Sequence, residues 1–310
     1  MNAPARLEQR VAPAAPATLT RREFIGTVAL AAASAPLARG AAAPAWQIGC
    51  YTRPWPVTDY RTALDGIAAA GFKFAGLMTT KNGVVVQPAT PPEQVVTMAA
   101  EAKARHLSIA SIYGGDFMRK RTVDDGIANL RRLVDHAVRC RCPSLLLGGT
   151  GDPKLVDDYY KVVAECCEYA ATRGVGLTVK PHGGLNSTGP QCRQLIQKVG
   201  HRNFRLWYDA GNIFYYSEGR LNPVDDAATV DGLVVGMSIK DFLPPKDVNV
   251  TPGTGRVNFA AVLARLQRGG FTQGPLMVEC VAGTAVATVT AEAQKARRFV
   301  EQLIAEQRRG

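Results

Sequence analysis

The chain has 310 residues, a formal net charge of +11, seven cysteines and four histidines. The surplus of lysine and arginine is spread along the chain without a basic run or stripe, so we expect charged helix faces in water and no nucleic-acid surface. With so few histidines, the sequence excludes a histidine-rich metal centre. The cysteines lack paired Cys-x-x-Cys spacing, which argues against a structural zinc site and predicts no disulfide framework.

Residues 1–45 have the pattern of a twin-arginine signal peptide. Arg21 and Arg22 precede a weakly apolar, alanine-rich run that ends near Ala38. This run is shorter than the about 20 apolar residues that a membrane span requires. We expect recognition by the twin-arginine translocation machinery, export of the folded chain to the periplasm, and cleavage near residue 45, with an uncleaved anchor left open. The segment holds five arginines and two glutamates, so the remaining chain has a net charge of +8.

From residue 46 onward, short β-rich segments alternate with longer amphipathic segments, which predicts repeated strand–helix units. The expected strands are 47–51, 73–77, 108–113, 144–147, 176–180, 205–209, 234–240 and 275–280. The expected helices are 60–70, 92–105, 123–140, 155–173, 190–199, 224–231, 259–268 and 289–308. Eight such units predict one α/β domain over residues 46–310, a single (β/α)8 TIM barrel. No glycine-rich phosphate-binding motif follows a strand, which argues against an open dinucleotide-binding sheet.

In a TIM barrel the active site forms at the carboxyl ends of the strands. The first four strands end in residues that are polar, aromatic or glycine, without a clear catalytic set. Arg53 and Trp55 follow the first strand, Tyr113 ends the third, and a glycine-rich turn follows the fourth. Such residues suit a polar ligand with an apolar face, such as a sugar ring, although glycine turns equally often serve packing.

The last four strands each end in an ionisable residue. Lys180 and His182 lie two positions apart after the fifth strand and are expected to point to the same face. Asp209, Lys240 and Glu279 end the sixth, seventh and eighth strands. Buried charges are costly unless they are paired or bind a ligand, so these residues predict a functional site. Ion pairs that only hold loops are the alternative, and the other three histidines are expected at the surface.

These strand-end residues occur in motifs with a characteristic order. The motifs are Lys180-Pro181-His182, Tyr208-Asp209-Ala210-Gly211-Asn212, Ser238-Ile239-Lys240-Asp241, Gly253-Thr254-Gly255-Arg256-Val257-Asn258-Phe259 and Val278-Glu279. Together they resemble the sugar phosphate isomerase/epimerase superfamily, the xylose-isomerase-like TIM barrels, over most of residues 46–308. The resemblance implies a barrel enzyme that moves a proton beside a sugar carbonyl. The predicted catalytic residues are Lys180, His182, Asp209, Lys240 and Glu279. The predicted substrate-binding residues are Asn186, Trp207, Asn212, Asp241 and Arg256.

The chain departs from the family pattern at two metal-ligand positions. Typical members hold a divalent metal with Glu, Asp, His and Glu, but Lys180 replaces the first glutamate and Ser238 replaces the histidine. Asp209, Glu279 and His182 are the remaining candidate ligands for manganese, zinc or cobalt. In a metal-free alternative, a lysine ammonium polarises the carbonyl, a carboxylate takes the proton and His182 acts at the oxygen.

The sequence thus predicts an exported isomerase, epimerase or lyase acting on a small sugar or oxidised sugar. A catalytically idle barrel that binds carbohydrate is an alternative from a different class. A nuclease of the endonuclease-IV type is a remote alternative, because it needs a histidine-rich multi-metal site, and no nucleic-acid partner is expected. A homo-oligomer and a disulfide between Cys50 and Cys280 are left open.

Overall fold

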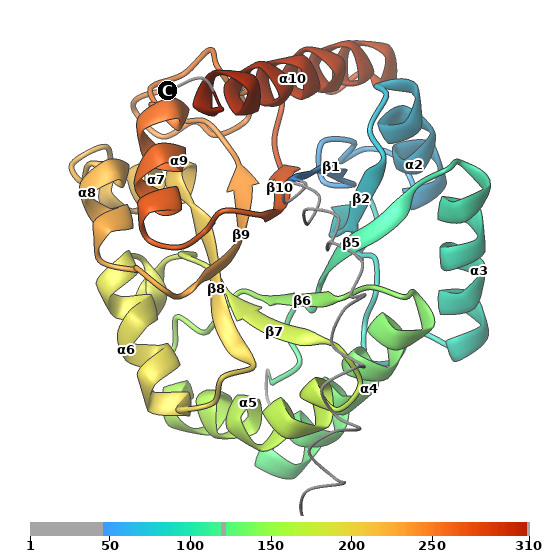
Figure 1. Ribbon diagram of the computed structural model, residues 1–310. Helices are drawn as coiled ribbons and strands as arrows, with labels where there is room; N and C mark the ends of the chain where they lie inside the picture. Colours follow the sequence, from blue (N-terminus) through green and yellow to red (C-terminus); the bar gives the residue numbers. More distant parts are fainter. Residues whose placement is uncertain (1–45, 119–121, 309–310) are drawn as a thin grey trace, which may run out of the picture. The chain divides into compact units, whose positions relative to one another are not determined.

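A closed parallel barrel forms the centre of the structure (Figure 1). The computed structural model describes residues 46–118 and 122–308, so the predicted twin-arginine segment lies outside the described residues. The barrel strands are β1 (Trp46–Tyr51), β2 (Phe74–Leu77), β5 (Ser108–Tyr113), β6 (Ser144–Leu147), β7 (Gly176–Val179), β8 (Phe204–Asp209), β9 (Val234–Ile239) and β10 (Gly274–Val278). They close in the order β1-β10-β9-β8-β7-β6-β5-β2. The predicted (β/α)8 TIM barrel is therefore confirmed.

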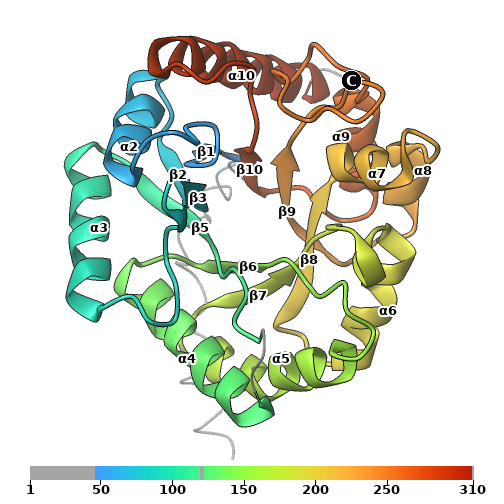
Figure 2. The ribbon, with the colours of Figure 1, turned by 180° about the vertical axis from the view of Figure 1, so that it is seen from behind.

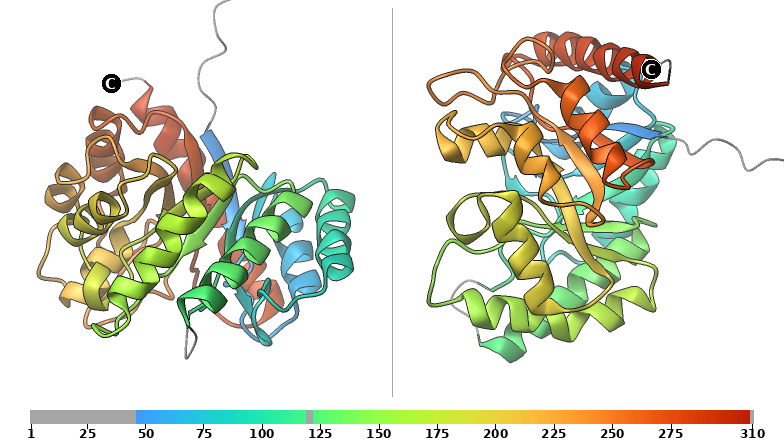
Figure 3. Two further views of the ribbon diagram at one scale, coloured as in Figure 1. Left: turned by 90° about the horizontal axis from the view of Figure 1, so that it is seen from below. Right: turned by 60° about the vertical axis from the view of Figure 1, so that its left-hand side comes forward.

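Helices surround this barrel on its outside (Figures 1 and 2). They are α2 (Tyr60–Ala69), α3 (Pro92–Ala104), α4 (Val123–Arg139), α5 (Val156–Ala171), α6 (Gly189–Val199), α7 (Ala210–Ser217), α8 (Pro223–Ala228), α9 (Phe259–Arg268) and α10 (Val286–Gln307). Local chemistry sets their ends. In α6, Thr188 and Gln191 form a capping box at the start, and Gly200 ends the helix with a φ of 67°. The side views show α4 and α5 lying next to each other along the barrel (Figure 3).

Two groups of apolar side chains fill the structure. The larger group lies between the strands and the helices and includes Leu77, Leu177 and Val278. The smaller group is the cluster of Tyr51, Met78, Ala110, Leu146, Trp207 and Met277. Alternate strand residues supply the two groups, since successive side chains point to opposite faces of a strand. The smaller group fills the barrel interior, so the barrel is a packed core with no channel through it.

The structure contains elements that the sequence analysis did not predict. Helix α7 follows β8 directly, and a two-stranded antiparallel ribbon, β3 (Thr79–Thr80) with β4 (Gly83–Val84), follows β2. A 3-10 turn, η1 (Gly184–Asn186), lies between β7 and α6. All three insertions follow the carboxyl ends of strands, which is the end that carries the candidate site.

The structure places the histidines partly as expected and buries the cysteines. His136 was expected at the surface but is buried, because it lies on the same face of α4 as Leu133 and Ala137. His106 is exposed, in the turn after α3. All seven cysteines are described, and all are buried free thiols, including Cys50 and Cys280.

Among the described residues, every helix is too short or too polar to cross a membrane.

Candidate active site

Charged residues follow four neighbouring strands at the carboxyl end of the barrel. Lys180 comes directly after β7, Asp209 ends β8, Lys240 comes directly after β9, and Glu279 comes directly after β10. These strands are neighbours in the order β10-β9-β8-β7. Because all the strands are parallel, their carboxyl ends meet at one end of the barrel, and the four side chains converge there.

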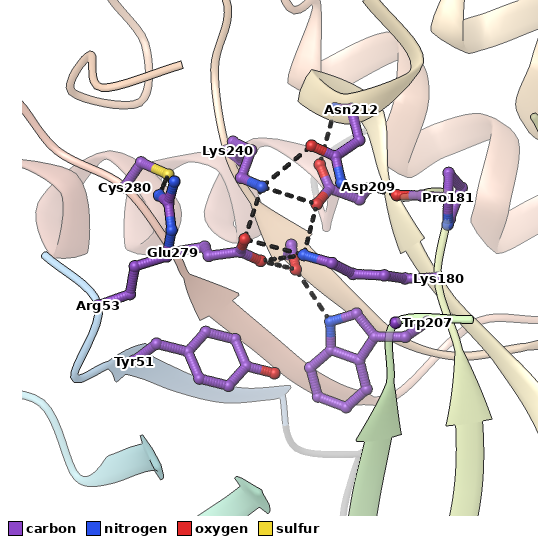
Figure 4. Close-up of polar contacts among 12 residues, drawn as sticks. Tyr51, Arg53, Lys180, Pro181, Trp207, Asp209, Asn212, Lys240, Glu279 and Cys280 are labelled. Atoms are coloured by element: carbon purple, nitrogen blue, oxygen red, sulfur yellow. Dashed lines mark hydrogen bonds and ion pairs between the residues drawn. The ribbon is translucent and has the colours of Figure 1, made fainter. Parts of the chain in front are cut away.

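The four side chains form one buried ion cluster (Figure 4). Lys180 Nζ lies 2.7 Å from Glu279 Oε2 and 3.1 Å from Asp209 Oδ2. Lys240 Nζ lies 2.5 Å from Glu279 Oε1 and 3.3 Å from Asp209 Oδ2. Each lysine therefore contacts both carboxylates. None of the four side chains is more than 4% exposed, so mutual pairing replaces the lost solvation.

The pairing keeps these groups charged. Burial alone would raise the pKa of the Glu279 carboxyl, but the charges of Lys180 and Lys240 hold that pKa well below its usual range. Burial alone would lower the pKa of the Lys240 ammonium, but the charges of Asp209 and Glu279 raise it above its ordinary value. At neutral pH, Glu279 is thus an anion and Lys240 a cation.

A chain of hydrogen bonds orients Glu279 from the barrel interior. Ser238 Oγ donates a hydrogen bond of 2.7 Å to Glu279 Oε2 and accepts one of 3.1 Å from Trp207 Nε1. Trp207 is fully buried and lies below the cluster beside Tyr51 (Figure 4). Ser238 also pairs with Asp209 in the register of β8 and β9. The core of the barrel therefore holds the carboxylate in one orientation.

Helix α7 fixes the other side of the cluster. Asp209 caps the helix, since its Oδ1 accepts a hydrogen bond of 2.9 Å from the Asn212 backbone N–H while Oδ2 faces the lysines. Asn212 Oδ1 accepts a hydrogen bond of 3.0 Å from Lys240 Nζ, and Asn212 Nδ2 donates one of 2.6 Å to the Pro181 carbonyl. The glycine at 211 permits this close approach, because a Cβ there would lie 2.5 Å from the Lys240 carbonyl oxygen.

A cavity of about 230 Å³ lies at this end of the barrel. Its lining residues are Arg53, Met78, Thr79, Tyr113, Lys180, His182, Asn212, Tyr215, Tyr216, Lys240, Val248 and Glu279. Both lysines and one carboxylate of the cluster thus face the cavity, whereas Asp209 supports them from outside its lining. Charged groups and aromatic rings share this wall, a combination that suits a ligand with hydroxyl groups and apolar C–H faces.

His182 stands between two tyrosines of this cavity. Its ring centroid lies 6.5 Å from that of Tyr113 and 6.0 Å from that of Tyr216. The residue is exposed and lines the cavity. Desolvation of the ring by its neighbours lowers the pKa of His182, and the charges of Lys180 and Lys240 lower it further. The imidazole is therefore neutral at pH 7 and can both donate and accept a hydrogen bond.

The comparison with known proteins agrees with this fold. The family described as xylose isomerase-like TIM barrel matches residues 64–303, which is most of the described barrel. The chain belongs to the xylose isomerase-like TIM barrel family.

Proteins that are similar to this chain include sugar epimerases. A probable L-ribulose-5-phosphate 3-epimerase of Mycoplasma pneumoniae is 30% identical over 146 residues, which cover 46% of this chain and 46% of that protein. This match therefore spans about half of the relative's length. The structure of D-psicose 3-epimerase in the presence of D-fructose has a TM-score of 0.67 at 13% identity, covering 83% of this chain and 99% of that one.

A second solved structure carries a metal. A xylose isomerase-like TIM barrel protein from Mycobacterium smegmatis, in complex with magnesium, has a TM-score of 0.67 at 17% identity, covering 83% of this chain and 97% of that one. At such identities, the structural similarities establish the shared fold.

In this member of the xylose isomerase-like family, the donor set does not fit a divalent cation. Hard cations need several oxygen ligands with free lone pairs. Here the Lys180 ammonium lies between Asp209 and Glu279, and Lys240 contacts the same two carboxylates. Within residues 46–118 and 122–308, no three His, Cys, Asp or Glu side chains are grouped to hold a metal ion. The geometry therefore does not support the predicted ligand set of Asp209, Glu279 and His182.

Four residues predicted to bind substrate lie outside the cavity lining. Trp207 is fully buried beneath the ion cluster. Asn186 Nδ2 donates to the Gly148 and Lys180 carbonyls and braces two loops. The Asp241 carboxylate accepts backbone N–H bonds from the loop that contains Gly253 and Gly255. Arg256 stacks its guanidinium on Phe214, with 5.1 Å between the Cζ atom and the ring centroid. Trp207 and Asn186 thus hold parts of the site in place, whereas Arg256 lines a separate cavity.

Asn212 is the predicted substrate-binding residue that lines the cavity. Among the residues not selected from the sequence, Arg53, Tyr113 and Tyr216 also line it. Arg53 and Tyr113 were noted at strand ends as residues that suit a polar ligand, but they were not assigned to the site. Tyr216 lies on α7, a helix that was not predicted, and no comparable sequence pattern pointed to it.

Proposed function

We propose that the protein is an enzyme that removes a proton from the carbon beside a carbonyl group of a small sugar derivative. The observation that carries the proposal is the cluster in which two lysines and Glu279 face one cavity. Sugar epimerases among the relatives support the same class of reaction. The outcome would be epimerisation, isomerisation or β-elimination, depending on where the proton returns or which group leaves.

The lysines supply the positive charge for this reaction. Removing the proton places negative charge on the carbonyl oxygen, and ammonium groups fixed beside that oxygen stabilise the charge without reorganisation. Lys180 and Lys240 both face the cavity and are held by buried carboxylates. No step of this scheme passes through a metal ion.

Glu279 is the proposed base. In the free protein its pKa is held low by the lysines, which makes it a weak base. A substrate oxygen that accepts hydrogen bonds from Lys180 and Lys240 would draw part of their charge away from the carboxylate and raise its basicity. His182 is neutral and lies at the cavity rim, so it can transfer a proton at a substrate oxygen.

Solvent exchange tests this function directly. Keto-sugars and keto-sugar acids are incubated with the protein in D2O, and NMR detects deuterium at the carbon beside the carbonyl. We expect exchange with the wild-type protein and its loss in Glu279→Gln. The control Glu301→Gln alters an exposed carboxylate on α10 that pairs with Arg297, and it should exchange at the wild-type rate. Exchange that persists unchanged in Glu279→Gln would contradict the role of this residue.

The second candidate is a barrel that binds carbohydrate without catalysis. The observation in its favour is that the lysines and carboxylates of the cluster already satisfy one another. It predicts saturable binding of a sugar by calorimetry with no deuterium in the recovered ligand, whereas the enzyme predicts both binding and exchange.

A further inference from the structure

Arg53 is held at the cavity by the loop that follows β1. The Thr52 backbone N–H donates to the Gly76 carbonyl at 2.9 Å, and Thr52 Oγ1 accepts from the Met78 N–H at 3.0 Å and donates to the Thr79 carbonyl at 3.1 Å. Pro54 then restricts the backbone on the other side of Arg53. The guanidinium is therefore presented to the cavity from a braced segment.

The guanidinium of Arg53 interacts with the charges of Glu279 and Asp209 but is not directly paired with either carboxylate. Both carboxylates of the cluster are shared by Lys180 and Lys240, and within the described residues no ion pair reaches Arg53. Its guanidinium instead donates to Cys280 Sγ (Figure 4). Burial raises the pKa of the Cys280 thiol, so this partner is neutral.

Arg53 and the buried ion cluster together carry one more positive charge than negative charge. Arg53, Lys180 and Lys240 are cations, the carboxylates are Asp209 and Glu279, and His182 is neutral. An unbalanced cation in a partly desolvated cavity is costly unless a ligand supplies the opposite charge. A planar guanidinium matches a carboxylate through two parallel hydrogen bonds.

We infer that the substrate is a sugar acid whose carboxylate binds Arg53. This inference rests on the proposed function and specifies its substrate class. The single excess positive charge matches a carboxylate monoanion better than a phosphate dianion. Tyr113, Tyr215 and Tyr216 supply aromatic surface for the C–H faces of the sugar, and Lys180 and Lys240 remain available for the carbonyl oxygen.

Calorimetric titrations with matched ligands test the inference. The probes are D-fructuronate against D-fructose, D-glucuronate against D-glucose, D-fructose 6-phosphate as the phosphate arm, and D-glycerate as a small hydroxy acid without ring stereochemistry. We expect at least one carboxylate to bind at least about tenfold more tightly than its neutral partner, with an affinity that falls as salt is added. Tighter binding of the sugar phosphate, or no binding by any carboxylate, would overturn the inference.

Variants of Arg53 separate its charge from its structural contacts. Arg53→Gln should abolish the preference for the carboxylate over its neutral partner. Arg53→Lys keeps the charge and should retain part of the preference. The control Arg61→Gln changes an exposed arginine on α2 that pairs with Glu101, and it should behave like the wild-type protein. A carboxylate preference that survives in folded Arg53→Gln would contradict the assignment.

The two proposals fail in different ways. If carboxylates bind through Arg53 but acquire no deuterium, the proposed reaction is wrong and the ligand class is correct. If neutral keto-sugars exchange deuterium and the acids do not, the reaction is correct and the ligand class is wrong.

Discussion

Lys180 is the residue on which the proposed chemistry depends most, because its ammonium contacts both buried carboxylates and faces the cavity. Lys180→Met retains most of the side-chain length and removes the charge. We expect turnover to fall at least about a hundredfold, since loss of one electrostatic donor commonly costs that much. Breaking the buried pair should also lower the free energy of unfolding by about 3–5 kcal/mol.

Urea unfolding and deuterium exchange measure these two effects of Lys180→Met. The control is Lys198→Met, which removes a lysine paired with Asp157 on the exposed surface. This change should alter stability by less than about 1 kcal/mol and leave exchange intact. A Lys180→Met protein that is folded and exchanges at the wild-type rate would remove Lys180 from the mechanism.

Lys180 also explains why the carboxylates of the site disfavour a metal ion. Lys180 and Ser238 stand where the resemblance places a glutamate and a histidine ligand, so Lys180→Glu combined with Ser238→His should create a site for Mn²⁺. We expect near-stoichiometric Mn²⁺ in the double variant and a metal-dependent rise in its melting temperature, because a bound ligand stabilises the folded state. Electron paramagnetic resonance and mass spectrometry measure the metal. Comparable Mn²⁺ binding by the wild-type protein would show that its own residues suffice.

At the scale of elements, the approach of α7 to β9 positions the cluster. Gly211→Ala would place a Cβ 2.5 Å from the Lys240 carbonyl oxygen, a backbone atom that cannot rotate away. We expect α7 to shift, the Asn212 contact with Lys240 to lengthen, and the free energy of unfolding to fall by about 1–3 kcal/mol. Gly176→Ala is the control, because the nearest atom to its Cβ would lie at 3.6 Å. Equal unfolding midpoints in urea for the two variants would contradict this account.

The elements themselves were largely predictable from the sequence. Alternating β-rich and amphipathic segments identified the eight barrel strands, with ends within two residues of those observed. The pattern did not reveal α7, because Asp209 serves at once as the end of β8 and as the cap of the next helix. A single residue with both roles leaves no loop for sequence analysis to recognise.

The candidate site was predicted only in part, because the sequence pattern does not show how deep in the barrel each side chain lies. Trp207 and Asp209 were both predicted as site residues, and both do belong to the interior side of β8. The pattern could not show that Trp207 lies one layer deeper, where it supports Ser238 and does not reach the cavity. An ion pair between Lys180 and Glu279 was expected only as the alternative to a functional site, and the shared contacts of both lysines with both carboxylates depend on the closure of the whole barrel.

At the scale of the whole molecule, the ion cluster links stability to pH. The pKa of Glu279 is lower in the folded protein than the about 4.3 of an unfolded chain. The contribution of ionised Glu279 to the free energy of unfolding is therefore complete above the unfolded pKa and is lost as the pH falls through the lower folded pKa. Urea unfolding should show that the difference in free energy of unfolding between wild type and Glu279→Gln is largest near neutral pH and shrinks below about pH 4. The control Glu301→Gln should differ little from wild type in free energy of unfolding at any pH. A difference for Glu279→Gln that does not change with pH would contradict charge pairing in the cluster.

We also propose that the folded barrel is exported by the twin-arginine route, on the evidence of Arg21 and Arg22. All seven cysteines are buried free thiols in the described barrel, and the periplasm is oxidising. Export after folding would keep these thiols out of reach of oxidants, whereas threading an unfolded chain would expose them.

Replacing both arginines by lysine should therefore keep the protein in the cytoplasm in a folded state, which cell fractionation measures. Replacing residues 1–45 with a signal for unfolded export should yield periplasmic protein that is linked by disulfides on a non-reducing gel. A control with serine at all seven cysteine positions should lack those links. Native, thiol-containing protein recovered from the unfolded route would show that the order of folding and export does not protect the cysteines.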